Sequence, residues 1–305
     1  MLRHLAACLA ALVFAGPAGA SCPGAVSVEV LGSGGPIADD ERASAGYLVW
    51  IDGRARLLIE AGGGVFQRFG ASGAKVGDLD AILVGHFHVD HTNDLPAILK
   101  SGSFEPRRAP LSFVGAASGS GYPGAKDFLS ALYDPKTGAF RYQSGFLDGS
   151  GDLPRLDPVE VKTTRNEAVV VLENDDLKVT AIPVVHGPVP ALGFLVETGG
   201  ARIVFGGDQG SESKFFERFL ADGTVDLLIA HHAIPQAEGG EPNLLHRSPR
   251  QIGELAAAIG AKHLVLSHNM QRALVKLDAG LAAIGENYDG PVEVADDLSC
   301  YAVVE

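Results

Sequence analysis

Residues 78–99 read DLDAILVGHFHVDHTNDLPAIL, and this stretch decides how the rest of the chain is interpreted. The apolar run at 82–84 has the length and the branched side chains of a buried β-strand. The hexapeptide HFHVDH follows at 86–91, and residues 92–94 offer N-caps for the helix expected after them. Four side chains that can bind metal therefore lie where a strand gives way to a helix.

The spacing of these side chains predicts two metal ions. His86 and His88 are two residues apart in an extended segment, so they point to the same side and can share one ion. Asp90 and His91 come after the turn and face elsewhere, which suits a second ion beside the first. Imidazole and carboxylate together favour zinc, with manganese or iron as alternatives, over calcium. The alternative of a polar surface loop does not explain why the histidines cluster at one strand end.

The hexapeptide resembles the HxHxDH motif of the metallo-β-lactamase superfamily. Later motifs resemble the ribonuclease Z-like or arylsulfatase-like branch of its metal-dependent hydrolases, and the similarity runs from about Val26 to the C-terminus. The resemblance implies an α+β fold, an αββα sandwich of two mixed β-sheets with helices on the outer faces. The periodicity of the sequence by itself indicates only a mixture of helices and strands.

The resemblance also implies three further metal ligands, each near the end of an expected strand. His186, in VVHGPVPALGF, would join the ion held by the first two histidines. Asp208, in GGD, would bridge both ions through its two carboxylate oxygens. His268, which follows LVLS, would join the second ion. The alternatives are a helix cap for the aspartate and surface imidazoles for the two histidines.

Four side chains are predicted to take part in catalysis. Asp90 would orient or deprotonate the attacking water while also binding metal. The resemblance implies that His246, in HRS, donates a proton to the leaving group. His231 and His232 stand where the family often has His-Glu, and the Glu orients that donor. Substituting His232 for Glu removes a fixed charge. His263, at the start of an apolar strand, is expected to be structural.

Two other positions belong to this comparison with the family. The loop LGSGG at 31–35 is similar to a loop that borders the active site in ribonuclease Z-like proteins, although a tight turn is the simpler interpretation. The family usually has Asp at the position of Glu60, where it supports the metal ligands. The longer side chain leaves the orientation of those ligands open.

The first 20 residues have the composition of a secretory signal peptide. Arg3 supplies a positive charge, residues 5–15 are apolar, and AGA at 18–20 predicts cleavage after Ala20. The apolar run is too short to remain as a membrane-spanning helix. We therefore expect a periplasmic or secreted protein that leaves the membrane after cleavage. Residues 21–305 are expected to form one domain with two pseudo-halves, about 25–165 and 166–305.

Two cysteines would remain after cleavage of the leader. Cys22 and Cys300 lie near opposite ends of the mature chain and could form a disulfide in an oxidising compartment. The sequence alone does not place their Cα atoms, so both the paired and the unpaired state stay open.

The composition limits the classes of substrate. The chain has 305 residues and a net charge of −13, which becomes −14 when Arg3 leaves with the signal peptide. An acidic chain without a basic stripe argues against a nucleic-acid partner and for a small-molecule substrate. We therefore predict an exported hydrolase with two metal ions that uses a metal-bound hydroxide on a small ester, a phosphodiester or sulfate ester preferred.

Several alternatives to this function stay open. A β-lactamase, a lactonase or an organophosphate hydrolase would use the same fold, and a binding protein on a decayed hydrolase scaffold would not be an enzyme. A flavodiiron-type redox protein ranks last because no flavodoxin-like domain is visible. The sequence also leaves a homodimer open.

The segment 116–158 is long for a connection and is rich in Gly, Ser and Asp, which is typical of lids and substrate arms. Phe140, Tyr142 and Phe146 are expected either to form an apolar wall there or to pack the segment onto the core. Further along the chain, helical periodicity predicts helices at 248–259 and 270–284.

Overall fold

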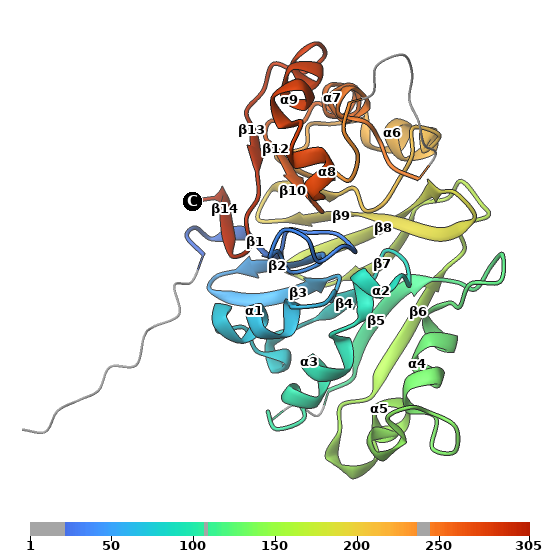
Figure 1. Ribbon diagram of the computed structural model, residues 1–305. Coiled ribbons are helices and arrows are strands. Elements are labelled where there is room, and N and C mark those ends of the chain that lie inside the picture. The colour runs from blue at the N-terminus through green and yellow to red at the C-terminus, as the bar shows by residue number, and fades with distance from the viewer. Residues whose placement is uncertain (1–21, 107–108, 237–244) are drawn as a thin grey trace, which may run out of the picture.

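Two seven-stranded β-sheets pack face to face in the computed structural model, which describes residues 22–106, 109–236 and 245–305 (Figure 1). The expected signal peptide at 1–20 lies outside these residues. The first sheet has the strand order β14(Ser299–Val304), β1(Val26–Gly32), β2(Gly46–Ile51), β3(Arg54–Ile59), β4(Ala81–Leu83), β5(Leu111–Ala116) and β6(Leu156–Val161). The second has the order β13(Val292–Val294), β12(Leu264–Ser267), β11(Leu227–His231), β10(Ala201–Phe205), β9(Val189–Thr198), β8(Leu177–His186) and β7(Val169–Glu173).

Helices cover the outer face of each sheet, so the molecule has four layers (Figure 1). The first sheet is covered by α1(Val65–Ser72), α3(Leu95–Gly102), α4(Ala125–Tyr133) and α5(Gly145–Asp148), and the second by α6(Lys214–Leu220), α7(Pro249–Ala258), α8(Gln271–Leu274) and α9(Leu277–Gly285). The short α2(Val89–Thr92) lies at the edge, and the 3₁₀ turns are η1(Val76–Asp78), η2(Arg141–Gln143) and η3(Ser150–Asp152). Both sheets mix parallel and antiparallel pairs, which confirms the predicted αββα sandwich.

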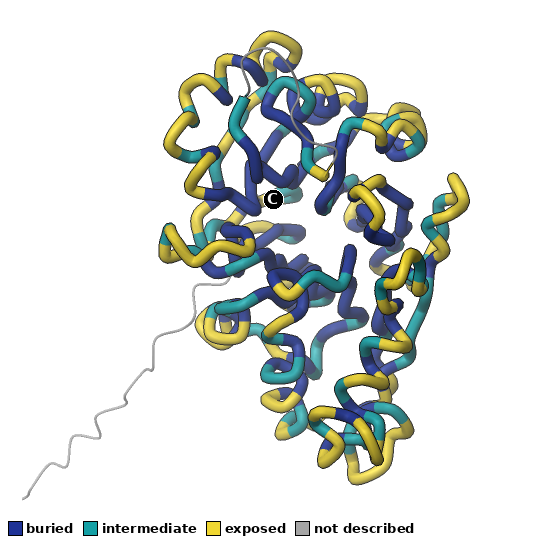
Figure 2. The backbone as a smooth tube through the Cα atoms, turned by 45° about the vertical axis from the view of Figure 1, so that its right-hand side comes forward, coloured by how far each residue is buried: buried dark blue, intermediate teal, exposed yellow. Residues whose placement is uncertain are grey.

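The alternation of side chains along each strand builds the layers. In β4, Ala81 and Leu83 face the core between the sheets, whereas Ile82 faces the helices outside. The buried strand β12 does the same, with Val265 inward and Leu264 outward. Each such aliphatic side chain contributes about 1.5–3 kcal/mol by leaving water. Buried backbone accordingly lies at the centre of the molecule and exposed backbone at the outer helices and loops (Figure 2).

Strand direction brings the ends of several strands to one edge of the sandwich. Strands β10, β11 and β12 are parallel, and β8 runs the same way because it and β10 are both antiparallel to β9. Their carboxyl ends therefore meet at one edge of the second sheet. In the first sheet, β4 runs parallel to its neighbours β3 and β5, and the hexapeptide follows its carboxyl end.

Two local predictions about helices were wrong. The helix expected at 270–284 is broken into α8 and α9, because Lys276 leaves helical geometry with φ −121° and ψ 25°. Asp94 precedes α3 but makes no side-chain bond to it. Its carboxylate instead accepts the backbone N–H groups of Gly64 at 2.8 Å and Phe66 at 3.0 Å, and so it caps α1.

The helix expected at 248–259 is α7, and Ser248 closes a capping box with Gln251 at its start. In the segment 116–158, Phe146 is fully buried in the core, whereas Tyr142 is 71% exposed. None of the helices in the described part of the chain is long and apolar enough to cross a membrane.

A disulfide joins Cys22 to Cys300 and fastens the first described residue to the last strand. The two Cα atoms are 5.5 Å apart, and the bond spans 278 residues. Strand β14 pairs antiparallel with β1, so the first and last described strands lie side by side at one edge of the first sheet. Of the two states that the sequence left open for these cysteines, the structure therefore contains the disulfide-bonded one.

We predict that replacing both cysteines, in the variant Cys22→Ser/Cys300→Ser, lowers the free energy of unfolding by about 2–5 kcal/mol, because a long loop is no longer closed in the unfolded chain. Urea unfolding of the oxidised protein, the reduced protein and the double variant measures this difference. The reduced protein should match the double variant. Equal stability of the oxidised and reduced proteins would contradict the prediction.

Candidate metal centre

The hexapeptide sits where β4 ends and α2 begins. His86 and His88 lie side by side with ring centroids 4.4 Å apart, and His88 takes the N-cap position of α2 in extended geometry. The Thr92 hydroxyl donates to the His88 carbonyl at 3.0 Å and fixes the turn. Asp90 and His91 belong to α2 and are buried beside them.

The predicted ligands form two groups of donor atoms. His86, His88 and His186 have one donor atom each within 4.8 Å of the others, and Asp90, His91 and His268 form a second such group. Because His186 ends β8 and His268 follows β12, the second sheet completes both groups that the hexapeptide begins. The structure therefore brings together side chains from three separate parts of the sequence.

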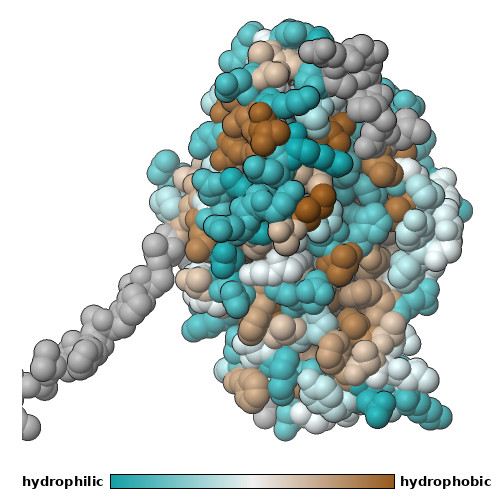
Figure 3. Space-filling view, viewed as in Figure 1, coloured by the Kyte–Doolittle hydropathy of each residue, from teal (hydrophilic) through white to brown (hydrophobic). Residues whose placement is uncertain are grey.

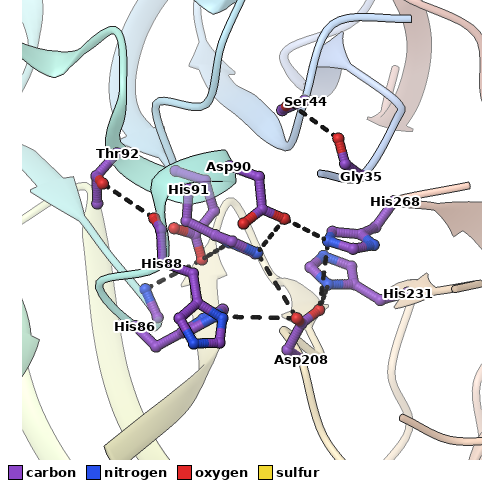
Figure 4. A network of polar contacts seen from close by, with 12 residues as sticks. Gly35, Ser44, His86, His88, Asp90, His91, Thr92, Asp208, His231 and His268 are labelled. Atoms are coloured by element: carbon purple, nitrogen blue, oxygen red, sulfur yellow. Dashed lines mark hydrogen bonds and ion pairs between the residues drawn. The ribbon is translucent and has the colours of Figure 1, made fainter. Parts of the chain in front are cut away.

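Asp208 lies between these two groups (Figure 4). Its Oδ2 is 3.9 Å from His86 Nε2 and 3.7 Å from His91 Nε2, while its Oδ1 is 3.6 Å from His268 Nε2. It follows β10 and is only 4% exposed. A carboxylate in this position has one oxygen for each of two cations.

Unpartnered ring nitrogens show that the donor set fits two metal ions. His86 Nε2 and His91 Nε2 are buried, and neither has a hydrogen-bond partner within the described part of the chain. Buried polar atoms are normally paired, so two bare nitrogens facing one carboxylate are a cost that a bound cation removes. Five imidazoles and two carboxylates match the ligand preferences of zinc and related transition metals.

The electrostatics of the metal-free site are set by burial and by the charges around Asp208. Burial opposes protonation of His91, but the charge of Glu60 and the contacts with Asp208 and Asp90 outweigh it and raise the His91 pKa well above its ordinary value, so a proton leaves when a cation binds. Burial lowers the pKa of His86 well below its ordinary value, which leaves the neutral imidazole that binds metal. Burial opposes ionisation of Asp208, but the charge of His268 and the contacts with His231 and His91 outweigh it and hold the carboxyl pKa well below its usual range. Asp90 also keeps a lowered pKa, because its bonds to His268 and His91 overcome the effect of burial.

Glu60 supports His91 in spite of its departure from the family pattern. Its Oε1 accepts the Gly85 backbone N–H at 3.0 Å and lies 3.3 Å from His91 Nδ1. Burial raises the pKa of Glu60, and the neighbouring His91 opposes that rise. The backbone φ of +60° at Glu60 turns the chain at this point.

His231 bonds to the Asp208 carboxylate through one ring nitrogen and to Tyr47 through the other. Its Nδ1 is 2.7 Å from Asp208 Oδ1, and its Nε2 is 3.1 Å from the Tyr47 hydroxyl, which also donates to Ser267 Oγ at 3.0 Å. Burial lowers the pKa of His231 to about 3, so its ring is neutral. Its position is that of a residue that orients the bridging carboxylate. Tyr47 was missed from the sequence because it lies far from the ligands along the chain and its hydroxyl reaches Asp208 through His231.

His232 contacts none of the predicted metal ligands in the described part of the chain, and its role beside His246 stays a prediction. Neighbouring residues of an extended strand point to opposite sides, so the ring that follows His231 faces away from the metal centre. Its Nδ1 bonds instead to Asn269 Oδ1 at 3.1 Å, and its pKa is lowered by burial. No contact with His246 is found in the described part of the chain. His263 is structural in position, with Nε2 2.9 Å from Glu293.

His246 lies at the mouth of the site. Its Nδ1 is 3.7 Å from Asp208 Oδ1, and its ring centroid is 5.4 Å from that of His186. Burial lowers its pKa to about 4. The next residue, Arg247, is 4% exposed and pairs with Glu217 at 2.9 Å, which anchors the segment. The Leu245 carbonyl is 2.9 Å from His186 Nδ1 and orients that ligand.

The glycine loop also borders the site. A Cβ on Gly35 would lie 3.0 Å from the His268 ring, so a larger residue here would push against that ring. The Asp297 carboxylate accepts the backbone N–H groups of Ser33 at 3.0 Å and Ala43 at 2.9 Å, which ties the loop to the start of the segment before β2. The Asn269 N–H donates to the Ser33 carbonyl at 2.7 Å and joins the loop to the residue after His268.

Two mixed sheets with this carboxylate-centred group of histidines at their common edge define a metal-dependent hydrolase with a site for two ions. The family model of the beta-lactamase superfamily domain matches residues 55–269, so the chain belongs to that family. This confirms the resemblance inferred from the hexapeptide.

Curated relatives and solved structures show which members of the superfamily this chain resembles. Ribonuclease Z of Mycolicibacterium paratuberculosis is 29% identical over 283 residues, covering 90% of this chain and 96% of the relative. The human short-form tRNase Z structure has a TM-score of 0.68 at 19% identity, covering 91% of this chain and 99% of that one. The metallo-beta-lactamase fold protein YhfI of Bacillus subtilis has a TM-score of 0.67 at 19% identity, covering 90% and 99%.

These findings contradict two predictions. The relatives are named as ribonucleases, whose substrate is RNA, so the small-ester substrate and the absence of a nucleic-acid partner were both wrong. The predicted export is not tested by these relatives. The error has a physical origin. Net charge averages over the whole surface, whereas phosphodiester chemistry depends on the cations gathered at one site.

We predict that the variant His88→Ala keeps its fold but binds about one zinc ion per chain where the unaltered protein binds about two, because one ligand group loses a member. Elemental analysis after dialysis, with circular dichroism for the fold, measures this. The matched control is His263→Ala, which removes a histidine outside the centre and should keep both ions. Loss of zinc from the control to the same extent would refute the assignment.

Proposed function

We propose that this protein is a metal-dependent phosphodiesterase of the ribonuclease Z type that cleaves a phosphodiester bond of RNA. The similarity to ribonuclease Z along almost the whole relative is the observation that carries the proposal. The donor set around Asp208 supports it, because a two-ion site suits the displacement of an oxygen at phosphorus. We propose zinc as the resident ion, supported by the predominance of imidazole ligands.

The ions would be held by the two donor groups, with Asp208 between them. When bound, they supply Lewis-acid stabilisation of the charged phosphate and lower the pKa of water. The chain's own residues orient the reaction. Asp90 accepts a hydrogen bond from the attacking water, and His231 holds the Asp208 carboxylate through the 2.7 Å contact.

His246 is proposed to protonate the departing ribose oxygen. It stands at the mouth, 3.7 Å from Asp208, where a leaving group can reach it. In the metal-free protein its lowered pKa, about 4, makes it neutral at pH 7. A phosphodiester anion beside the ring favours the protonated form and thereby prepares it as an acid.

The compartment remains a separate proposal. We propose that residues 1–20 direct export and that the protein works in the periplasm or outside the cell. The Cys22–Cys300 disulfide supports this, since such bonds persist in oxidising compartments. N-terminal sequencing should find a secreted product that begins at Ser21, and thiol titration should find no free thiol in it. An uncleaved product in the cytosol would refute the proposal.

We predict that the zinc-loaded protein cleaves an RNA hairpin with a single-stranded 3′ extension and that chelator abolishes the reaction. A DNA strand of the same sequence and bis(p-nitrophenyl) phosphate serve as comparison substrates. Gel analysis locates the cut, and zinc re-addition should restore it. Protein that carries both ions yet leaves every phosphodiester intact would refute the proposed reaction.

We predict that His246→Ala slows RNA cleavage by about 10²–10⁴-fold but slows hydrolysis of bis(p-nitrophenyl) phosphate by less than about tenfold, because nitrophenolate leaves without a proton. The kcat values for both substrates, with zinc content measured in parallel, test this difference. His263→Ala is the control. An equal loss on both substrates would assign His246 to metal binding or folding instead of proton donation.

A further inference from the structure

A row of four polar side chains is buried beside the metal centre. Figure 3 shows hydrophilic side chains spread over the face of the molecule that it displays, where water can reach them. The four members of the row are instead no more than 6% exposed: Ser267, Tyr47, His231 and Asp208. A buried polar group lowers stability unless it is hydrogen-bonded, so each member of the row constrains the position of the next.

The Tyr47 hydroxyl connects the two sheets within this row. Tyr47 belongs to β2 of the first sheet, whereas His231 and Ser267 are a register pair on the parallel strands β11 and β12 of the second. The Tyr47 hydroxyl oxygen lies 3.1 Å from His231 Nε2 and 3.0 Å from Ser267 Oγ, so it contacts both members of that pair. The tyrosine ring packs against the Phe205 ring, with centroids 5.6 Å apart. The packed ring therefore presents the hydroxyl to the second sheet at a fixed place.

The hydrogen on His231 determines what this hydroxyl can do. A neutral imidazole has one N–H group, and at Nδ1 that group donates to the Asp208 carboxylate at 2.7 Å (Figure 4). Nε2 is then an acceptor, and it receives the hydrogen of the Tyr47 hydroxyl when that group turns from Ser267. The Ser267 hydroxyl can rotate in return and donate to the tyrosine oxygen. Every hydrogen in the row then points toward Asp208.

The row ends on the Asp208 oxygen that faces one particular donor group. Oδ1 accepts from His231 Nδ1 and lies 3.6 Å from His268 Nε2. The second donor group comprises Asp90, His91 and His268. Because a carboxylate oxygen has two lone pairs, Oδ1 bonded to His231 keeps one lone pair for a cation of this group. Removing a hydrogen-bonding group behind a metal ligand typically weakens metal binding by about 10–100-fold.

We propose that Tyr47 is a positioning residue of the metal centre. Its hydroxyl fixes the His231 ring, and that ring fixes Asp208 Oδ1 for the ion of the second donor group. Tyr47 acts through His231 and not by contact with an ion or a substrate. The proposal concerns the metal ions alone, so it does not depend on RNA being the substrate.

Competition with a chromophoric chelator for zinc tests this proposal on the full chain. The variant Tyr47→Phe removes one oxygen and keeps the ring that packs on Phe205. We expect zinc to bind the second donor group about 10–100-fold more weakly in this variant. The comparison is repeated in His88→Ala, where only the second donor group should keep its ion. The visible spectrum of the cobalt(II)-loaded chain, which depends on ligand geometry, should change as well.

The matched control is Tyr133→Phe, which removes the hydroxyl of another fully buried tyrosine, on α4 in the core outside the first sheet. This variant should keep the zinc affinity and the cobalt spectrum of the unaltered protein. Urea unfolding of the metal-free chains measures the effect of each substitution on the fold. A Tyr47→Phe chain that unfolds more readily but binds zinc and cobalt like the unaltered protein would overturn the proposal.

The route through His231 is tested by combining two substitutions. If Tyr47 acts only through that ring, adding Tyr47→Phe to a His231→Ala chain should weaken zinc binding by less than about twofold further. Losses of affinity that add in full would show that Tyr47 reaches the metal centre by another route, and would refute the proposal. These measurements use no substrate, so a failure of the proposed RNA cleavage is seen separately.

Discussion

A carboxylate buried away from water stays ionised only if positive or hydrogen-bonding groups surround it, and this requirement governs the structure around Asp208. The side chain is 4% exposed and lies within 4 Å of histidines from both sheets. Among the predicted ligands, His86 and His91 have buried Nε2 atoms without a hydrogen-bond partner in the described part of the chain, and a cation would satisfy both. The carboxylate, the imidazoles and the ions form a mutually dependent set, and the sheets must align at one edge to assemble it.

How much of this could be predicted from the sequence depends on the distance over which each interaction acts. The hexapeptide predicts strand, turn, helix and four ligands because all the information lies within a few residues. The partnership of Tyr47 with His231 joins residues 184 positions apart and depends on how the sheets face each other. Asp94 was assigned to its own helix, yet the packing of α1 against α3 offered it closer N–H groups.

His231, the last residue of β11, and His232, which follows it, were both predicted to act at the site. Strand alternation allows only one of His231 and His232 to face the metal centre, and this rule can be applied to the sequence alone. The family pattern outweighed it in the prediction. The prediction of the substrate class was wrong because it relied on the net charge of −13, which describes the whole surface. If RNA is the substrate, as proposed, an acidic surface weakens its long-range attraction and leaves recognition to short-range contacts near the site.

The return of the last strand to the first has a consequence for the order in which the protein can assemble. A ribosome releases the β1 segment early, but its neighbour β14 begins at Ser299, so one edge of the first sheet stays open until residues 299–304 have been released. The loop beside His268 is likewise held by Asp297. A chain that ends before Asp297 would have an unpaired β1 edge, which is prone to aggregation, and a metal centre without its loop anchor. Loss of the C-terminus by proteolysis or a premature stop should therefore remove solubility and activity in one step.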